Sequence, residues 1–329
     1  MTWLTWRQYR FQLYVAAALL AAFAAVIVIN GRQVATQLRN AAASCQAGHS
    51  CVNYGGGGLF MGSRVIGFMV IATLAAPLLF GLFWGAPLVA GEIESGTVQF
   101  AWTQGITRRH WLAVKAGWLM LASAVWGTAI AALVTWWYSP GYAYGFNRFD
   151  PGHFDLLDLV PVGYAVFATA LGICTGALLR RTLPAMAVTL GGFIAVRAVI
   201  TFWLRSHYMS AVTTYYSVTS GNGPRGAFWQ LAFGVIGPNG QQLPQPNNTP
   251  YVDGIPQTYL PGACSNLLGS GAGHPTPACV QALSRFRSFI TYQPADRFWT
   301  FQGIETGIFI LLSAILLVVT AVVLIRRDA

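Results

Sequence analysis

The segment Gly91–His110, with the sequence GEIESGTVQFAWTQGITRRH, is a short polar stretch between two long apolar ones, 65–90 and 111–137. It carries too many charged and polar side chains to lie within lipid, where every backbone group must be satisfied internally. It is also too short to form a domain with its own core. We therefore interpret it as a loop that joins two membrane-spanning helices on one side of a bilayer.

Apolar stretches of this kind recur along the whole chain. A hydrocarbon core about 30 Å thick requires roughly 20 apolar helical residues. The chain has 329 residues, of which 55% are apolar and 9% are charged, and its mean hydropathy is +0.53, which excludes an ordinary soluble protein. We predict an all-α membrane protein in which residues 1–329 form a single transmembrane domain. The six predicted spans are 11–29, 65–90, 111–137, 159–179, 184–203 and 304–325.

The distribution of basic residues predicts the orientation. With the N-terminus inside the cell, the cytoplasmic segments are 1–10, 91–110, 180–183 and 326–329. The external segments are then 30–64, 138–158 and 204–303. The cytoplasmic set holds eight basic groups in 38 residues, whereas the external set holds nine in 156. Basic residues concentrate on the cytoplasmic side of membrane proteins, so both termini are predicted to be cytoplasmic. The net charge of +10 thus reflects topology, and no nucleic-acid partner is expected.

The largest predicted external segment, 204–303, is rich in Gly, Pro, Asn and Gln. We predict a mostly irregular extracellular cap between the fifth and sixth spans, with a helix near 279–290. The first external segment should be a flexible loop, because it contains a run of four glycines at 55–58. Residues 1–10 are amphipathic, and they form either a short interfacial helix or an extension of the first span.

Four of the five cysteines fall on the predicted external side. Cys45 and Cys51 form one close pair in the sequence, and Cys264 and Cys279 form another, whereas Cys174 lies within a span. The external face is oxidising, so we predict disulfides between Cys45 and Cys51 and between Cys264 and Cys279. Crossed pairings remain an alternative.

One charged residue lies deep in a predicted span. Arg197 is about 9 Å from the outer end of the fifth span, and Glu305 begins the sixth span at that outer level. Because isolated charges are costly in lipid, we predict an Arg197–Glu305 ion pair, with Asp158 as a rival partner. The alternatives are that Arg197 extends to the outer headgroups or gates a substrate.

Sequence motifs for catalysis are absent. The chain contains no Walker A motif, no HExxH, no GxSxG and no CxxC, and its five histidines are isolated from one another. We therefore expect no enzyme active site, no metal and no cofactor in this chain.

The polar segment has an internal order of its own. Glu92 and Glu94 favour a helix N-terminus, where acidic side chains interact well with the helix dipole. Ser95 or Thr97 has the side chain of a capping residue, so we predict a short helix over 97–103.

That helix would carry two large aromatic side chains, Phe100 and Trp102, on a cytoplasmic surface. Exposed aromatic groups of this size favour a partner protein. The alternative is that they rest on the membrane interface. Arg108 and Arg109 then mark the return of the chain to the membrane.

The same segment carries a family resemblance. GEIESGTVQFAWTQGITRRHWLAVK resembles the loop between the second and third spans of type 2 ABC transporter permeases, especially those of high-GC Gram-positive bacteria (actinobacteria). The matching pattern is E-x-E-x-G-T followed by A-W-T-Q-x-x-x-R-x-x-W. A second similar stretch is YQPADRFWTFQGIETGIF, Tyr292–Phe309, which enters the last span.

The resemblance implies that the loop is a coupling helix that docks on a separate ATPase subunit. The residues expected to contact or position that subunit are Glu92, Glu94, Gly96, Thr97, Phe100 and Trp102. Gly96 would permit a sharp entry turn. The resemblance also implies two ATPase copies, which bind ATP and Mg²⁺, and a second membrane subunit that is either identical or similar.

We therefore expect the permease subunit of an exporter in the bacterial plasma membrane, surrounded by lipid. Its substrate would be an amphipathic or hydrophobic drug, antibiotic, lipid or peptide. The alternatives are a nucleotide-independent channel or secondary carrier, and a membrane-anchored ligand-binding or immunity protein.

Overall fold

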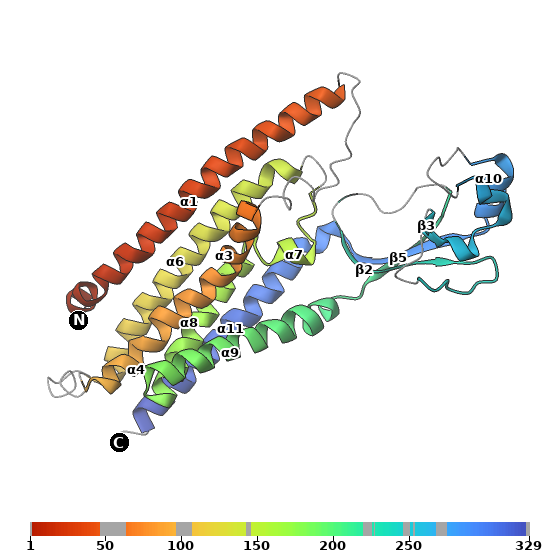
Figure 1. The fold of residues 1–329 in the computed structure, drawn as a ribbon. Coiled ribbons are helices and arrows are strands. Elements are labelled where there is room, and N and C mark those ends of the chain that lie inside the picture. Colours follow the sequence, from red (N-terminus) through yellow and green to blue (C-terminus); the bar gives the residue numbers. More distant parts are fainter. Residues whose placement is uncertain are drawn as a thin grey trace. The chain divides into compact units, whose positions relative to one another are not determined.

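The computed structural model describes residues 2–46, 64–96, 107–142, 146–219, 226, 228–245, 251–252, 254–267 and 275–326 (Figure 1). The chain divides into two compact units. Unit 1 consists of Met1–Tyr208 and Phe298–Ala329, and unit 2 consists of Met209–Arg297.

Unit 1 is helical. Its α-helices are α1 (Thr2–Gln46), α3 (Arg64–Phe80), α4 (Ala86–Glu94), α6 (Arg108–Tyr142), α7 (Pro151–Phe154), α8 (Val160–Leu179), α9 (Thr182–Val199) and α11 (Phe298–Arg326). A π-helical turn, η1 (Gly81–Gly85), joins α3 to α4. A second π-helical turn, η2 (Ile200–Leu204), continues α9 and is followed by the 3₁₀ turn η3 (Arg205–His207).

Six helical stretches of the described chain are long and apolar enough to cross a membrane, which confirms the predicted all-α, six-span fold. They are Tyr14–Gln37, Gly67–Glu94, Arg109–Tyr142, Val160–Leu179, Thr182–His207 and Ala295–Arg326.

The first helix is much longer than the sequence analysis expects. The predicted span is 11–29, with a loop from residue 30 and an amphipathic segment before residue 11, but α1 runs from Thr2 to Gln46 without interruption. No proline occurs between these residues, and the segment after residue 30 is rich in Ala, Gln and Arg. These residues favour helix over loop, so the apolar span carries a polar helical extension at each end.

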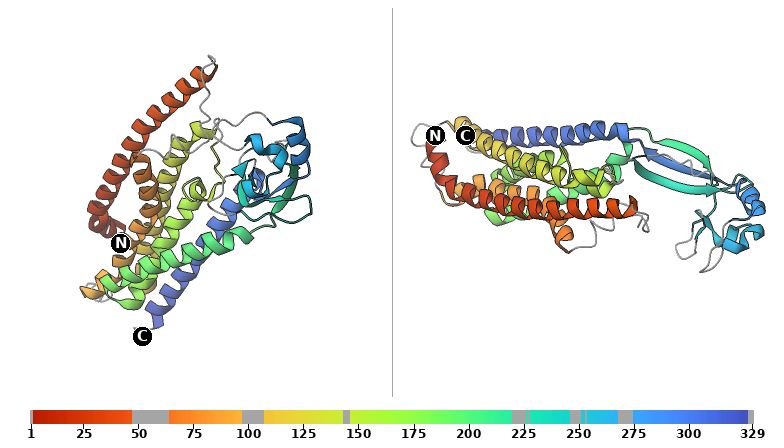
Figure 2. Two further views of the ribbon diagram at one scale, coloured as in Figure 1. Left: turned by 45° about the vertical axis from the view of Figure 1, so that its right-hand side comes forward. Right: turned by 90° about the horizontal axis from the view of Figure 1, so that it is seen from above.

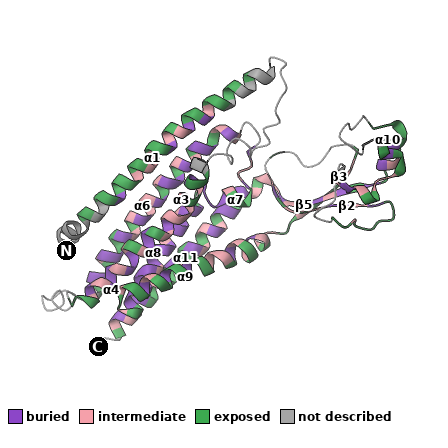
Figure 3. Cartoon of the chain, in the orientation of Figure 1, coloured by how far each residue is buried: buried purple, intermediate pink, exposed green. Residues whose placement is uncertain are grey.

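Helix α8 forms the centre of unit 1 (Figure 3). Within its span 72% of the residues are buried, against 28% or less in each of the other five. Its small residues allow close contact with η1 and α4. A Cβ atom on Gly172 would lie 2.5 Å from the carbonyl oxygen of Gly81, and one on Gly176 would lie 2.6 Å from that of Ala86. Small residues four apart on facing helices permit this approach, which is typical of helix packing in membranes.

The start of α1 and the end of α11 lie at the same end of the helices of unit 1 (Figures 1 and 2). The end of α4, the start of α6 and the α8–α9 turn are also at this end, which we call the terminal end. The opposite end, where α6 meets α7 and where η3 lies, is the far end.

Unit 2 contains strands, which the predicted irregular cap did not include. Strands β1 (Val212–Ser217), β5 (Arg287–Gln293) and β2 (Trp229–Ile236) form an antiparallel sheet in the order β1-β5-β2. A second sheet pairs β3 (Tyr251–Val252) with β4 (Ile255–Pro256). The 3₁₀ turns are η4 (Gln257–Tyr259), η5 (Gly262–Leu267) and η6 (Ala295–Arg297).

The helix expected near 279–290 is shorter and begins earlier. Helix α10 covers Pro277–Leu283, and the chain then enters β5, because Phe289 pairs with Tyr215 of β1 and with Gly234 of β2. Aromatic and β-branched residues in β5 pack across the sheet more favourably than along a helix.

The predicted disulfide between Cys264 and Cys279 is confirmed. Both cysteines are buried in a small core with Val235, Ile255 and Leu283. Cys51 lies outside the described residues, so its pairing with Cys45 stays a prediction. Cys174 is a free, buried cysteine in α8.

Candidate functional site

The end of α4 forms the first part of the candidate site, on the predicted coupling loop. Helix α4 continues to Glu94, and Ser95 closes it by donating its backbone N–H to the carbonyl of Gly91 at 3.0 Å. The N–H of Gly96 donates to the carbonyl of Ile93 at 3.2 Å, and Gly96 has a φ of +72°. This is the left-handed conformation that glycine adopts after a helix, and here it ends α4. The coupling helix that Gly96 is expected to lead into lies outside the described residues.

The acidic segment thus ends a helix, whereas its residues predict the start of one. Carboxylates near a helix C-terminus interact unfavourably with the helix dipole. At Glu92 and Glu94 this cost is offset by contacts to two other helices.

Glu92 faces the interior of unit 1. It accepts a hydrogen bond from the ammonium group of Lys115 in α6, and both residues are buried. The same ammonium group lies 5.0 Å from the ring centroid of Trp111. Glu92 therefore joins α4 to α6 from inside, which is a positioning role.

Glu94 reaches the start of α9. Its carboxylate accepts hydrogen bonds from the backbone N–H of Thr182 at 3.0 Å and from the hydroxyl of Thr182 at 2.8 Å. It thus caps the N-terminus of α9. The positive dipole end of α9 attracts this carboxylate, whereas the C-terminal end of α4, where Glu94 lies, repels it. The short α8–α9 turn and the end of α4 are held together.

The central part of the loop lies outside the described residues. Thr97, Phe100 and Trp102 fall in this stretch, so the helix over 97–103 and their contact with an ATPase stay predictions. The chain returns at Thr107, whose carbonyl accepts the N–H of Trp111 at 3.0 Å as α6 begins.

Four charged side chains form a buried cluster at the far end, which we call the charge cluster: Asp155, Arg197, Arg205 and Glu305. Arg205 donates from Nε to Oε2 of Glu305 at 2.8 Å and from Nη2 to Oε1 at 2.6 Å. It also forms an ion pair with Asp155. Arg197 donates to the other oxygen of Asp155 at 2.7 Å. Arg205 and Glu305 are 1% and 0% exposed, so these charges are shielded from solvent and paired with one another.

Tyr164 of α8 lies between the two carboxylates. Its hydroxyl oxygen is 2.7 Å from Oε1 of Glu305 and 3.1 Å from Oδ1 of Asp155, so its single proton is donated to one of them at a time. The guanidinium of Arg197 lies 4.5 Å from the ring centroid of Tyr164. The cluster therefore connects α8, α9, η3, α11 and the segment that precedes α8.

The π-helical turn η2 aligns the two arginines. Eight residues separate Arg197 from Arg205, which in a regular α-helix would leave their directions about 80° apart. The extra residue in a π-turn reduces this difference to about 20°. Both guanidinium groups can then reach Asp155 from one helical segment.

A buried glutamine supports the cluster. The side-chain oxygen of Gln302 in α11 accepts the backbone N–H groups of Leu159 at 3.1 Å and Val160 at 3.0 Å, where α8 begins. Its amide nitrogen donates to the carbonyl of Phe154 at 3.2 Å. Helix α11 thus caps α8.

The predicted Arg197–Glu305 pair is wrong in its partners. Arg197 pairs with Asp155, and Glu305 pairs with Arg205. The rival Asp158 instead has a φ of +58° and donates its backbone N–H to the hydroxyl of Thr135 at 3.0 Å. Sequence reasoning missed Asp155 and Arg205 because it assigned both to external loops, whereas α9 and its π-turn extend the helical span to residue 207.

Outside the spans, burial shifts three ionisable groups near the cluster. It raises the pKa of Asp158 and of Tyr208, and it lowers the pKa of His153, because in each case it disfavours the charged form. Across the described ranges, no group of three His, Cys, Asp or Glu side chains is placed to hold a metal ion.

Comparison with known proteins identifies the family to which the chain belongs. No curated protein and no solved structure matches the chain. The family model described as "ABC-2 membrane transporter related" matches residues 17–205, a range that includes the end of α4, the predicted coupling loop and the arginines of the charge cluster. Since this match covers more than half of the sequence, the chain belongs to the ABC-2 membrane transporter related family, whose members are membrane permeases of ABC transporters.

Proposed function

We propose that this chain exports an amphipathic or hydrophobic substrate from the cell and is driven by a separate ATPase subunit. It is a multi-pass permease of the bacterial plasma membrane, and ABC permeases work with ATPase and membrane subunits. We propose three further points: the direction of transport is export, the substrate is amphipathic or hydrophobic, and two ATPases assemble with two membrane subunits.

The observation that carries this proposal is the bracing of the coupling loop on both sides. Glu92 ties α4 to α6 through Lys115, and Glu94 ties α4 to α9 through Thr182. A force applied to residues 97–106 would therefore reach three helices together and move them as a rigid body.

Packing against α8 would carry that movement toward the far end. The backbone of Gly85 lies so close to α8 that an added Cβ would be 2.8 Å from the carbonyl oxygen of Thr169. Such close backbone contact leaves little room for α4 and η1 to slide along α8. A displacement at the terminal end thus becomes a displacement of the helices that hold the charge cluster.

In this proposal the ATPase receives the loop through Thr97, Phe100 and Trp102. Phe and Trp supply a large apolar contact area, which suits the centre of an interface. Glu92 and Glu94 position the loop from behind. ATP and Mg²⁺ bind to the ATPase subunit.

Co-purification of the ATPase tests the proposal. The tagged chain is purified from its native membranes, and the Mg²⁺-dependent ATPase activity that accompanies it is measured. Trp102→Ala should reduce that activity at least tenfold, because loss of one interface hot spot costs roughly 2 kcal/mol or more. The matched control is Trp118→Ala in α6, where the side chain is 52% exposed on the helix surface.

Retention of the ATPase after Trp102→Ala, or after replacement of 97–104 by a Gly/Ser segment, would contradict the coupling role. Export is tested separately. In inverted vesicles, ATP should drive accumulation of a lipophilic cation dye or of a labelled lipid, and uptake into right-side-out cells instead would contradict the direction.

A further inference from the structure

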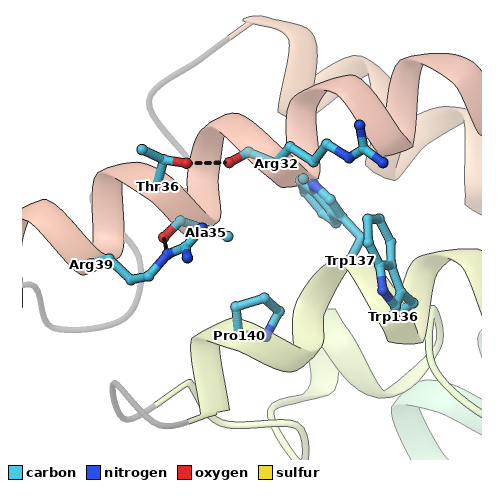
Figure 4. Close-up of a pocket in the computed structure, with 8 residues that line it drawn as sticks. Arg32, Ala35, Thr36, Arg39, Trp136, Trp137 and Pro140 are labelled. Atoms are coloured by element: carbon cyan, nitrogen blue, oxygen red, sulfur yellow. Dashed lines mark hydrogen bonds between the residues drawn. The ribbon is translucent and has the colours of Figure 1, made fainter.

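A groove between α1 and α6 at the far end is lined by two arginines and two tryptophans (Figure 4). Its volume is about 420 Å³, which is within the range of small-molecule sites. Arg32 and Arg39 come from α1, and Trp136 and Trp137 come from α6. None of these residues belongs to the coupling loop or to the charge cluster.

The apolar wall of the groove is fixed in place. Trp137 is buried and donates its indole N–H to the side-chain oxygen of Asn30 at 3.1 Å. Gly31 allows this approach, since a Cβ atom there would lie 2.9 Å from Cδ1 of Trp137 and 3.1 Å from Cζ3 of Trp136. The wall is therefore formed before any ligand binds, which lowers the entropic cost of binding.

The cationic side of the groove is exposed, because the side chains of both Arg32 and Arg39 are open to the surroundings. Arg32 and Arg39 are seven residues apart, so they lie two turns apart on nearly the same face of α1. Ala35, a small side chain between them, leaves space at the bottom of the groove. The Nε of Arg39 donates to the carbonyl of Ala35 at 3.2 Å, which holds that side chain along the helix and leaves its terminal nitrogens for another acceptor.

No carboxylate of this part of the chain can neutralise the two arginines. The sequence contains no Asp or Glu before Glu92, and none between Glu94 and Asp150. Helices α1 and α6 and the segments that follow them up to residue 149 therefore carry no acidic group. Among the ion pairs of the described residues, none includes Arg32 or Arg39.

The groove also lies at the depth of lipid headgroups. The apolar span of α1 ends at Gln37 and that of α6 ends at Tyr142, so the groove lies at the last turns of both, with Arg39 two residues beyond the end of the α1 span. Tryptophan is enriched at this depth, where the indole ring contacts acyl chains and its N–H remains near polar groups.

We propose that this groove binds the phosphodiester headgroup of an anionic glycerophospholipid from the leaflet at the far end. The guanidinium groups of Arg32 and Arg39 hold the phosphate oxygens, a geometry that planar guanidinium groups favour. The ring of Trp136, which is 48% exposed, covers the glycerol and the first acyl carbons. The bound lipid bridges α1 to α6.

Lipid binding to the purified full-length chain tests the proposal by native mass spectrometry, with phosphatidylglycerol and phosphatidylcholine as the probes. Wild type should prefer phosphatidylglycerol. The double change Arg32→Gln/Arg39→Gln should weaken binding of phosphatidylglycerol about 25-fold, roughly fivefold for each lost charge, and leave binding of phosphatidylcholine unchanged.

The matched control is Arg10→Gln/Arg326→Gln, which removes the same charge from two exposed arginines near the terminal end. It should weaken phosphatidylglycerol binding less than threefold. An equal loss in both double variants would mean general electrostatic attraction and would overturn the site. Equal binding of the two lipids by wild type would overturn it as well.

A second variant tests whether the space in the groove is needed in addition to its positive charge. Ala35→Trp keeps both arginines and fills the space between them, and it should also weaken phosphatidylglycerol binding at least tenfold. Unchanged binding would overturn the proposal. Competition with inorganic phosphate is the last test. At millimolar concentration, phosphate should not displace the bound lipid. Full displacement would show that the site binds the free anion, which contradicts a lipid site.

Discussion

Replacing Arg205 by methionine is expected to destabilise unit 1 more than any other single change in the charge cluster. Arg205 supplies two hydrogen bonds to Glu305 and the ion pair to Asp155, and its side chain is 1% exposed. Methionine has a similar length and no charge, so the change removes the partner with little loss of volume.

The expected loss of stability depends on the partners that each carboxylate keeps after Arg205 is replaced. Asp155 keeps Arg197 at 2.7 Å. Among the described residues, the partners left to Glu305 are the hydroxyls of Tyr164 at 2.7 Å and Tyr208 at 3.3 Å, which are neutral donors. Loss of one partner from a buried ion pair typically costs 3–5 kcal/mol, and because Asp155 remains paired we expect about 3 kcal/mol.

Thermal unfolding in detergent, followed by the loss of helical circular dichroism, measures this cost. A loss of about 3 kcal/mol should lower the Tm by roughly 6–12 °C for a unit of this size. Arg197→Met should have a smaller effect, since Arg197 makes one ion pair and its side chain is 17% exposed. Arg181→Met, at an exposed position of the α8–α9 turn, is the matched control and should change stability by less than about 0.5 kcal/mol.

A double variant then distinguishes the cost of an unpaired buried charge from the cost of altered packing. Arg205→Met with Glu305→Leu leaves Asp155 and Arg197 as a neutral pair, and it should recover at least half of the lost stability. The reasoning would be refuted if Arg197→Met were the more harmful single change, or if the double variant were less stable than Arg205→Met alone.

Three further predictions concern other parts of the molecule. Gly172→Ala should cost about 1–3 kcal/mol, because the new Cβ would lie 2.5 Å from a backbone oxygen, whereas Gly117→Ala, with nothing within 4 Å, should be neutral or stabilising by Tm. Replacing Cys264 and Cys279 by serine should destabilise unit 2 by about 3 kcal/mol for a separation of 15 residues, seen as faster proteolysis within 209–297 with the Tm of unit 1 unchanged. Burial lowers the pKa of His153, so this residue contributes its full stability above its ordinary pKa and loses it as the pH falls through the lowered pKa. The Tm should therefore drop more between pH 7.5 and 5 in wild type than in His153→Leu. Equal drops in the two proteins would contradict this prediction.

Sequence reasoning recovers the helical framework because lipid imposes a strong requirement. Long apolar stretches are easily counted, and so the six spans are found. The ends of the helices are harder, since they depend on local residues. At Glu94 the acidic side chains indicate a helix start by their preference for positive dipole ends. The structure meets this preference with the N-terminus of α9, which lies 88 residues further along the chain.

The partners in the charge cluster were beyond sequence reasoning for a similar reason. The expected pair required Arg197 and Glu305 at one depth, which assumes a regular α-helix. The π-turn at Ile200–Leu204 shifts the register and adds Arg205 to the helical span. Sequence gives no clear signal for such a turn, because its extra residue is stabilised by contacts made elsewhere in the fold.

The sheet of unit 2 was missed because its strands lie far apart in sequence. Strand β5 lies between β1 and β2, and its residues pair with Val212–Ser217 and Trp229–Ile236. The intervening Gly- and Pro-rich segment dominates the composition, and composition alone favours an irregular loop. The local pairing of Cys264 with Cys279 was predictable, since close cysteines in an oxidising compartment have few alternatives.

The formal charges of the two arginines and two carboxylates at the far end sum to zero. Moving one elementary charge through the full membrane potential requires work of about 2.3 kcal/mol per 100 mV, but a neutral group of charges that moves as one body requires almost none. If the helices shift with this cluster intact, the voltage across the membrane should neither assist nor oppose the step. A conformational change that separated Arg197 and Arg205 from their carboxylates along the membrane normal would, by contrast, make the transport cycle sensitive to voltage.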